Sequence, residues 1–259
     1  MQRLLVRIGA PIVVLVVFVT CWWVASANST SVFFPPLHDI LIAFKDNWFS
    51  SNLVDKAVPS LVRVTIGLVL AVIGGVTIGA LLGLLPKVDV FVRPELEFMR
   101  ALPPILIFPP LLLVMGTGDS MKVAVIAVSA VWPILLATTD GVKAVEPLRY
   151  DMGRAFGLPW SARVRWIILP TAIPHIWSAV RAAVPIAIVV MVASEYFAST
   201  NGLGAFISET SVSFRMADMW SVVLLLGFFG MLINGVVAAI GTGLDRQFGE
   251  FGDLASGRG

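Results

Sequence analysis

The chain has 259 residues, of which 58% are hydrophobic and 13% are charged, and its formal net charge is +2. Soluble domains carry about 25% charged residues, so this composition excludes an ordinary globular domain and indicates an integral membrane protein. The small net charge argues against nucleic-acid binding, and the lack of a G-x-x-x-x-G-K-[ST] loop argues against nucleotide binding by this chain.

Six segments are predicted to cross the membrane as helices, since such a helix needs about 20 mostly apolar residues. Barrel strands would be about half as long. Prolines interrupt the third segment, and Trp132-Pro133 lies past the middle of the fourth, so we expect kinked helices within a bundle. The sequence thus predicts an all-α polytopic membrane protein, with one transmembrane domain over 1–259 and spans at 8–26, 62–85, 97–116, 121–139, 177–198 and 219–242.

The first span has a second interpretation. Two arginines, an apolar run and the sequence ASA at 25–27 resemble a cleavable signal peptide. The tryptophan pair at 22–23 is more typical of an interface anchor, so we favour a retained span. A mature protein that starts at Asn28 would contradict this topology.

The distribution of positive charge predicts the orientation. With the N-terminus in the cytoplasm, thirteen of the 18 basic residues lie on inner segments or inner span ends, and five lie outside: Lys45, Lys56, Arg63, Lys122 and Arg215. Cytoplasmic segments carry an excess of Lys and Arg, so we expect both termini and the segment 140–176 in the cytoplasm. Residues 31–58 then form the longest outer segment, where we expect a short interfacial helix.

The most informative stretch is DMGRAFGLPWSARVRWIILP, at 151–170. It carries four charged residues between two apolar spans, which indicates contact with a partner in water. Asp151 is expected to start a short helix, and Gly157 is expected to end it in the left-handed conformation. Phe156 and Leu158 offer apolar contacts beside that end.

This stretch resembles the signature of permease subunits of binding-protein-dependent ABC importers. That signature reads Glu-Ala-Ala, three residues, Gly, nine residues and then Ile-x-Leu-Pro. The spacing from Gly157 to Pro170 is intact, whereas Asp151-Met152-Gly153 stands where Glu-Ala-Ala is usual. Further stretches, such as FFPPLHDIL before the second span, look like the nitrate/sulfonate/taurine branch, so that the resemblance extends over about residues 33–247.

The resemblance implies a type I ABC importer permease fold with six transmembrane helices, and a cytoplasmic loop that couples the chain to an ATPase. The residues implied in coupling are Asp151, Gly153, Arg154, Ala155, Phe156, Gly157, Leu158, Leu169 and Pro170. The implied partners are ATPase subunits that hold ATP and magnesium, a second permease subunit (identical or paralogous), an external solute-binding protein and the bilayer of the bacterial inner membrane. The chain itself is then a transport subunit for a small polar solute, not an enzyme, and has no cofactor.

Three polar residues within the spans are candidates for the pathway or its gating: Glu195, Asn234 and Ser129. An intramembrane carboxylate is a functional hypothesis by default, so Glu195 lines the pathway, acts in gating or bonds to a neighbouring helix. For Ser129 and Asn234 we favour hydrogen bonds between helices. Glycines 75, 79 and 83 of the second span have the spacing that permits close helix contact.

Two other classes stay open as alternatives. An ion-coupled secondary transporter of a small solute would need carboxylates or histidines within the bundle, and the spans contain few. A membrane-embedded enzyme would need a buried catalytic constellation. The sequence offers one cysteine and two distant histidines, His38 and His175, so no metal site is expected. Pull-down of an ATPase partner would separate the importer from both alternatives.

Overall fold

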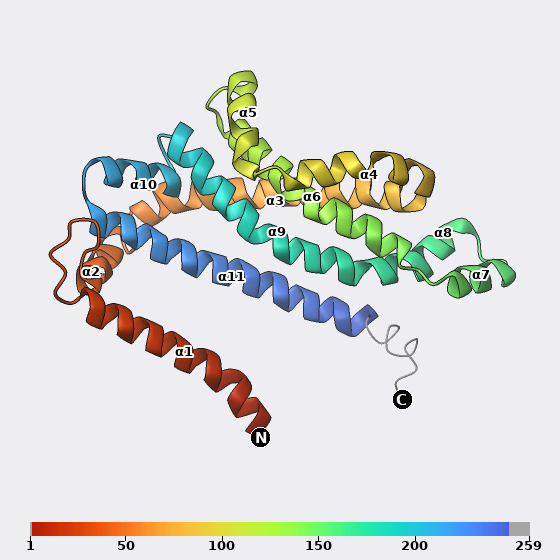
Figure 1. Cartoon of the computed structure of the whole chain (residues 1–259), viewed down its shortest axis with the longest axis horizontal. Helices are drawn as coiled ribbons and strands as arrows, with labels where there is room; N and C mark the ends of the chain where they lie inside the picture. The colour runs from red at the N-terminus through yellow and green to blue at the C-terminus, as the bar shows by residue number, and fades with distance from the viewer. Residues whose placement is uncertain (1, 249–259) are drawn as a thin grey trace.

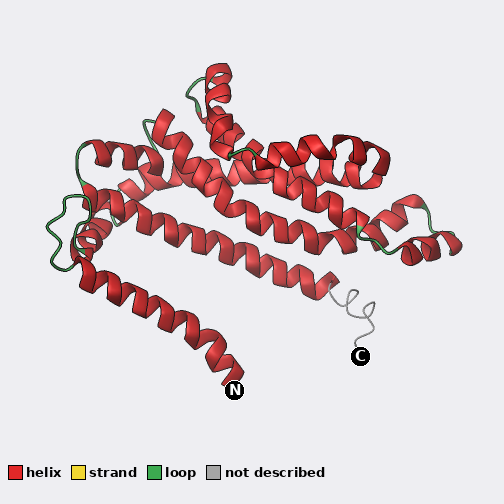
Figure 2. Cartoon of the chain, in the orientation of Figure 1, coloured by secondary structure: helices red, strands yellow, loops and turns green. Residues whose placement is uncertain are grey.

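The computed structural model describes residues 2–248, among which there is no β-strand (Figure 2). The helices are α1 (Gln2–Ser26), α2 (Leu37–Trp48), α3 (Val58–Leu84), α4 (Pro86–Ala101), α5 (Phe108–Met115), α6 (Asp119–Lys143), α7 (Pro147–Ala155), α8 (Trp160–Arg163), α9 (Leu169–Ala198), α10 (Leu203–Val212) and α11 (Met216–Phe248). Three short helical segments of different pitch precede α3, α5 and α9: η1 (Leu53–Ala57), η2 (Pro104–Ile107) and η3 (Val164–Ile168). The predicted all-α class is confirmed.

Four helical stretches of the described chain are long and apolar enough to cross a membrane: Leu53–Leu84, Asp119–Lys143, Trp160–Ala198 and Met216–Gly241. They overlap the expected spans at 62–85, 121–139, 177–198 and 219–242. Of the first expected span, 8–26, the residues Val13–Ser26 form a shorter apolar helix.

The third expected span, 97–116, is wrong as a single helix. α4 ends at Ala101, and the chain resumes at η2 and α5 with a bend of 98° (Figure 1). Proline has no N–H and disfavours the helical conformation in the residue before it, so Leu102 before Pro103 is extended, with φ −67° and ψ 133°. The described residues therefore give four spans, or five if this bent pair counts as one, where six were expected.

Helices α3, α6 and α9 form the core of the bundle. α11 lies along α9, α1 stands apart from the core, and α5 projects from it (Figure 1). The long axis ends in α7 and α8 on one side and in α2 and α10 on the other, so we refer to the α7 end and the α10 end of the molecule. α2 packs against α11, where the indole nitrogen of Trp48 donates to Ser221 Oγ at 3.1 Å.

Glycines bring α3 directly against α6. A Cβ on Gly75 would lie 2.9 Å from the side chain of Ile134, and a Cβ on Gly79 would collide with the backbone carbonyl oxygen of Leu135. The hydroxyl of Thr139 donates across the contact to the carbonyl of Gly79 at 3.1 Å. The predicted close contact is therefore made within this chain, and no side chain fits between the two helices.

Replacement of Gly79 by alanine is expected to force α3 away from α6. Overpacking of this kind costs about 1–3 kcal/mol, and the obstacle is backbone, which cannot swing aside. The melting temperature of the detergent-solubilised protein should therefore fall. Gly74→Ala is the matched control, because its Cβ would meet only the side chain of Val131, at an ordinary 3.7 Å. Equal melting temperatures for the two variants would contradict this packing of α3 on α6.

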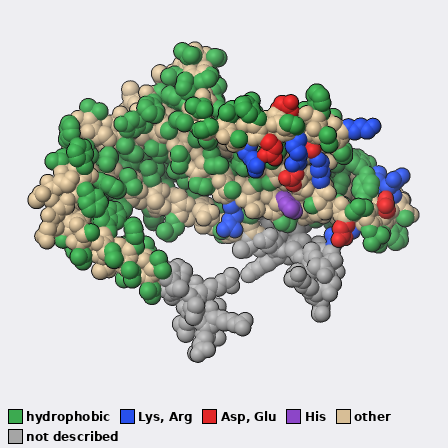
Figure 3. All heavy atoms as spheres, in the orientation of Figure 1, with side chains coloured by type: hydrophobic (Ala, Val, Ile, Leu, Met, Phe, Trp, Pro, Cys, Tyr) green, Lys and Arg blue, Asp and Glu red, His purple; other side chains and the backbone are tan. Residues whose placement is uncertain are grey.

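Charged side chains gather over the part of the molecule that carries α4 and the α7 end (Figure 3). Asp89 on α4 is buried and pairs with Lys143 of α6 and with Arg93 Nε at 3.2 Å. Arg93 also pairs with Asp140. These ion pairs tie α4 to the end of α6 from which the loop to α7 emerges.

Candidate functional site

The segment between α6 and α9 stands on a small apolar base. Val142, Ile168 and Ala172 form a buried cluster against which Tyr150 and Val164 pack. The cluster joins the last turn of α6 to the first turns of α9, so α7 and α8 extend beyond the ends of the long helices (Figure 1). The segment is thus held firmly at its base and presented at the end of the molecule.

Helix α7 begins earlier than the sequence predicts. It starts at Pro147 after Glu146, and Asp151 is exposed in its middle. Proline is favoured at the first helical position because its missing N–H would have no partner there in any case. The expectation that the Asp151 carboxylate lies at the positive end of the helix is therefore wrong.

Gly157 ends α7 as expected. Its φ is +68°, its N–H donates to the Arg154 carbonyl at 2.9 Å, and the N–H of Leu158 donates to the Gly153 carbonyl at 3.0 Å. This pair of bonds is the Schellman motif, in which a left-handed residue closes the helix. A residue other than glycine would be strained at this φ.

An apolar ridge runs along the outer face of α7. Leu148 is 68% exposed, Met152 is 50% exposed and Phe156 is 77% exposed. Residues four apart lie on one face of a helix, so these three exposed side chains form a continuous row. Phe156 was expected from the sequence as an apolar contact, whereas Leu148 was not, because the spacing is visible only once the helix is known to start at Pro147.

Gly153 faces the other way and is buried against η3. A Cβ there would lie 2.8 Å from Ile167 Cδ1, which is the mobile end of a side chain. Arg163 is enclosed by the rings of Tyr150 and Trp160, with centroid distances of 5.1 and 5.3 Å. Of the remaining loop residues, Arg154, Ala155, Leu158 and Leu169 are exposed, and Pro170 is half-buried at the start of α9.

Glu195 lies at the α10 end and is fully buried, with 0% exposure. Its carboxylate accepts hydrogen bonds from Arg63 NH1 at 2.6 Å, from Ser60 Oγ at 2.7 Å and from the backbone N–H of Gly204 at 3.0 Å. Ser60 Oγ accepts in turn from the N–H of Leu203 at 2.8 Å. Glu195 and Ser60 therefore satisfy the first free N–H groups of α10, and they join α3, α9 and α10.

Arg63 extends this cluster to α6. It is 3% exposed, and its NH2 atom donates to Asp119 Oδ1 at 2.7 Å and to Asn201 Oδ1 at 2.6 Å. Lys122 Nζ lies 3.3 Å from the same Asp119 oxygen. We call Ser60, Arg63, Asp119, Lys122, Glu195 and Asn201 the Glu195 cluster.

The three pathway candidates are not brought together. Ser129 is buried in the middle of α6, Asn234 is exposed on α11, and Glu195 lies at the α10 end. Within residues 2–248, no three His, Cys, Asp or Glu side chains are placed to hold a metal ion. Arg63 forms an ion pair with Glu195. The sequence predicted Arg63 only as a positive charge on the outer side and gave no sign of this pairing.

The chain is similar to known transport proteins over most of its length. The description of the family that matches residues 67–249 is binding-protein-dependent transport system inner membrane component. Identity to the taurine transport system permease protein of Escherichia coli (strain K12) is 31% over 213 residues, which covers 79% of this chain and 77% of that protein. Identity to the nitrate import permease protein of Synechococcus elongatus is 26%, covering 82% and 74%.

The fold is also that of solved importers. A structure of the MetNI methionine ABC transporter in an inward-facing conformation superimposes with a TM-score of 0.62 at 18% identity, covering 72% of this chain and 93% of that chain. The arrangement is the type I ABC importer permease fold. The matched region includes both the α7 ridge and Glu195 with most of its cluster. The chain therefore belongs to the family of binding-protein-dependent transport system inner membrane components, and it is a multi-pass permease subunit of an ABC importer rather than an enzyme.

Proposed function

We propose that this chain is driven by an ATPase subunit that docks on the ridge of Leu148, Met152 and Phe156. The exposure of this ridge carries the proposal, because three large apolar side chains in a row have no partner within the described chain that covers them. Burial of one such side chain contributes about 1.5–3 kcal/mol. Arg154 and Asp151 lie on the same short helix and supply polar contacts at the rim.

We further propose the assembly that the family resemblance implies. Two permease subunits, identical or paralogous, form the pathway, and each takes one ATPase subunit that holds ATP and magnesium. The excess of basic residues on the α7 end and on the segments that flank it supports a cytoplasmic location for this end and for both termini. The α10 end then faces the external solute-binding protein.

The transported solute is a small molecule that carries an oxyanion group. The two relatives support this class through what their names say they transport, which is taurine in one case and nitrate in the other. Taurine is a sulfonate, and nitrate is itself an oxyanion. A common feature of the two is thus a compact anionic group with several oxygen acceptors.

In this proposal, Glu195 has a structural role at the α10 end. Its hydrogen-bond partners are residues of the chain itself, and they leave the carboxylate without access to solvent. The Glu195 cluster holds α3, α6, α9 and the start of α10 as one unit. Its contribution to gating is to keep that unit intact while other parts of the transporter move.

The proposal is tested by purifying the chain together with two proteins encoded by neighbouring genes, the ATPase and the solute-binding protein. The ATPase should copurify in mild detergent, and vesicles that contain both should take up solute only with ATP inside and binding protein outside. Uptake should continue in the presence of a proton ionophore. Uptake that needs an ion gradient and no ATP would instead support the secondary transporter.

A further inference from the structure

Phe214 ends α10 in a backbone conformation that phenylalanine rarely adopts. Its φ is +56°, and among the described residues it is the single non-glycine residue with a positive φ. The N–H of Phe214 donates to the Ser211 carbonyl at 3.2 Å. The N–H of Arg215 donates to the Thr210 carbonyl at 2.9 Å. This is the Schellman motif that also closes α7, where the left-handed residue is Gly157.

The side chain of Phe214 is unfavourable for this turn. A left-handed residue with a Cβ is strained, and glycine is the usual residue at this point of the motif. Strained residues persist where the surrounding structure holds them, and they cluster at binding surfaces and switch regions. A phenylalanine in place of the usual glycine therefore indicates a use for its ring.

The ring of Phe214 points outward. It is 64% exposed and contacts the ring of Phe33 edge-on, with 6.3 Å between the centroids. Phe33 is itself 65% exposed, and its carbonyl accepts from Trp220 Nε1 at 3.1 Å. That hydrogen bond holds the loop between α1 and α2 against α11. Because most of the surface of both rings is left uncovered, packing within the chain does not explain the phenylalanine.

A pocket of about 470 Å³ opens beside Phe214. The loop between α1 and α2 and the turn between α10 and α11 form it, and its lining includes the hydroxyl residues at 29–31. Its charged lining residues are Asp39, Arg215 and Asp218. Arg215 already pairs with Glu209 at 3.3 Å and with Asp218 at 3.6 Å, so the two carboxylates make the rim acidic.

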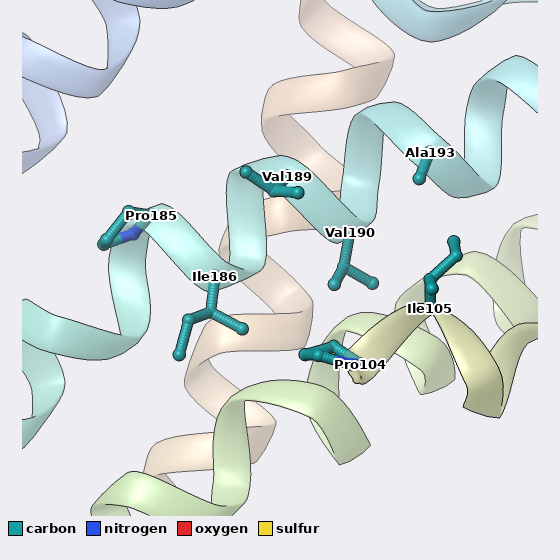
Figure 4. A pocket seen from close by; sticks show the side chains of 7 residues that line it. All are labelled: Pro104, Ile105, Pro185, Ile186, Val189, Val190 and Ala193. Carbon is teal, nitrogen blue, oxygen red and sulfur yellow. The ribbon is translucent and has the colours of Figure 1, made fainter. Parts of the chain in front are cut away.

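Two other cavities of the described chain have a different lining. One, of about 480 Å³, lies between η2 and α9, where Ile186 and Val190 point toward Pro104 and Ile105 (Figure 4). The other, of about 570 Å³, lies between α1 and α11 and reaches Trp220. The described residues that line these two are uncharged, as suits surfaces covered by hydrocarbon chains. The charged pocket beside Phe214 therefore belongs to the water side of the interface that Trp220 marks.

The chemistry of this surface favours a protein as its partner. Lipid surfaces are neutral or anionic, so carboxylates beside the two rings disfavour insertion of the rings into a membrane surface. A protein partner instead covers an exposed aromatic ring in an apolar pocket and brings basic groups toward Asp39 and Asp218. In the proposed importer, the protein that reaches the α10 end is the external solute-binding protein.

We propose that Phe214 and Phe33, with Asp39 and Asp218 at their rim, form the surface on which the external solute-binding protein docks. The ring of Phe214 enters an apolar notch of that protein, whose basic residues lie against the two carboxylates. The left-handed turn holds the ring outward before binding, so that little ordering is needed on association. This inference rests on the proposed importer function and adds the position and the chemistry of the docking surface.

Phe214→Gly separates docking from packing, because it relieves the backbone strain and removes the ring. The melting temperature in detergent should stay the same or rise. The affinity for the solute-binding protein should fall about 30-fold, as for a central aromatic residue of an interface. Phe214→Tyr keeps an aromatic ring and should retain most of the affinity. Biolayer interferometry measures binding between the chain, held with its ATPase in lipid nanodiscs, and the purified solute-binding protein encoded by a neighbouring gene.

Two further variants control for the loss of any exposed ring and for charge. Phe49→Ala is the matched control, since Phe49 is 84% exposed at the end of α2 and does not line the pocket, and it should bind like the wild type. Asp39→Asn should weaken binding at low ionic strength, and the difference from the wild type should shrink at high ionic strength.

Three results would overturn the docking surface. They are wild-type affinity in Phe214→Gly, an equal loss of affinity in Phe49→Ala, and a lower melting temperature of Phe214→Gly in detergent, which would give Phe214 a packing role. Wild-type affinity together with a melting temperature that falls only in nanodiscs would identify lipid as the occupant. ATP-driven uptake by the wild-type chain is scored with the same proteins, so a failure of the surface is distinguished from a failure of the importer assignment.

Discussion

Replacement of Phe156 by aspartate is expected to abolish ATP-driven uptake while leaving the protein in the membrane. Phe156 is the most exposed member of the α7 ridge and lies directly before the Gly157 turn. An aromatic side chain at the centre of a protein interface typically contributes about 2 kcal/mol or more, so its loss should weaken ATPase docking by about 30-fold or more. Burial of the new carboxylate in the interface with the ATPase adds a further penalty. The measurement is ATP-dependent uptake into vesicles, with copurification of the ATPase as the binding readout.

Two variants control this experiment. Phe156→Leu keeps an apolar side chain at the same exposed position and should retain most of the uptake. Gly157→Pro removes the φ of +68° and the N–H that donates to Arg154, so it should uncouple transport as Phe156→Asp does. The amount of protein in the membrane should be unchanged in all three. Normal uptake by Phe156→Asp would refute the docking surface.

Replacement of Glu195 by alanine is expected to be strongly destabilising, by about 3–5 kcal/mol. It would leave the buried guanidinium of Arg63 without its closest carboxylate and would remove the acceptor for Ser60 and for the Gly204 N–H. The melting temperature in detergent should fall sharply, and the start of α10 should become accessible to protease. Thermal unfolding of matched detergent preparations measures the first effect, and limited proteolysis measures the second.

The charge and the hydrogen bonds of Glu195 can be separated by two further variants. Glu195→Gln keeps an oxygen that accepts from Gly204 and Ser60, so it should cost less than alanine. The double variant Arg63→Met with Glu195→Met removes both buried charges together and should recover part of the stability lost in Glu195→Ala. If Glu195→Ala melted at the wild-type temperature, the Glu195 cluster would not be what holds the α10 end together.

The family and the spacing from Gly157 to Pro170 can be read from the sequence because both depend on local order. The spacing from Gly157 to Pro170 is a property of one short segment, and the left-handed φ of Gly157 follows from the same local rule. The start of α7 is harder to predict for a local reason too. Asp151 resembles the acidic first residue of a helix, although Pro147 is the stronger start signal four residues earlier.

The candidate sites inside the bundle depend on pairings between distant residues. Arg63 and Glu195 are 132 positions apart, and nothing in either segment indicates the other. The same holds for a cavity of about 260 Å³, which is lined by residues of separate elements, among them Arg100 of α4 and Ser129 of α6. The sequence favoured helix packing for Ser129, whereas the structure leaves its hydroxyl unpaired. Only the packing of the helices decides which polar atoms find partners.

The contact of α3 with α6 has a consequence for how motion passes through the molecule. Because backbone lies against backbone at Gly79, neither helix can rotate about its axis or slip along the other without separating. The two must then move as one stiff body, with α4 fastened to it by the ion pairs of Asp89. α6 has 25 residues and is about 38 Å long. We therefore expect a displacement imposed at the end of α6 nearest α7 to reach Asp119 at its other end, and the bend of 98° after Ala101 leaves α5 outside this body.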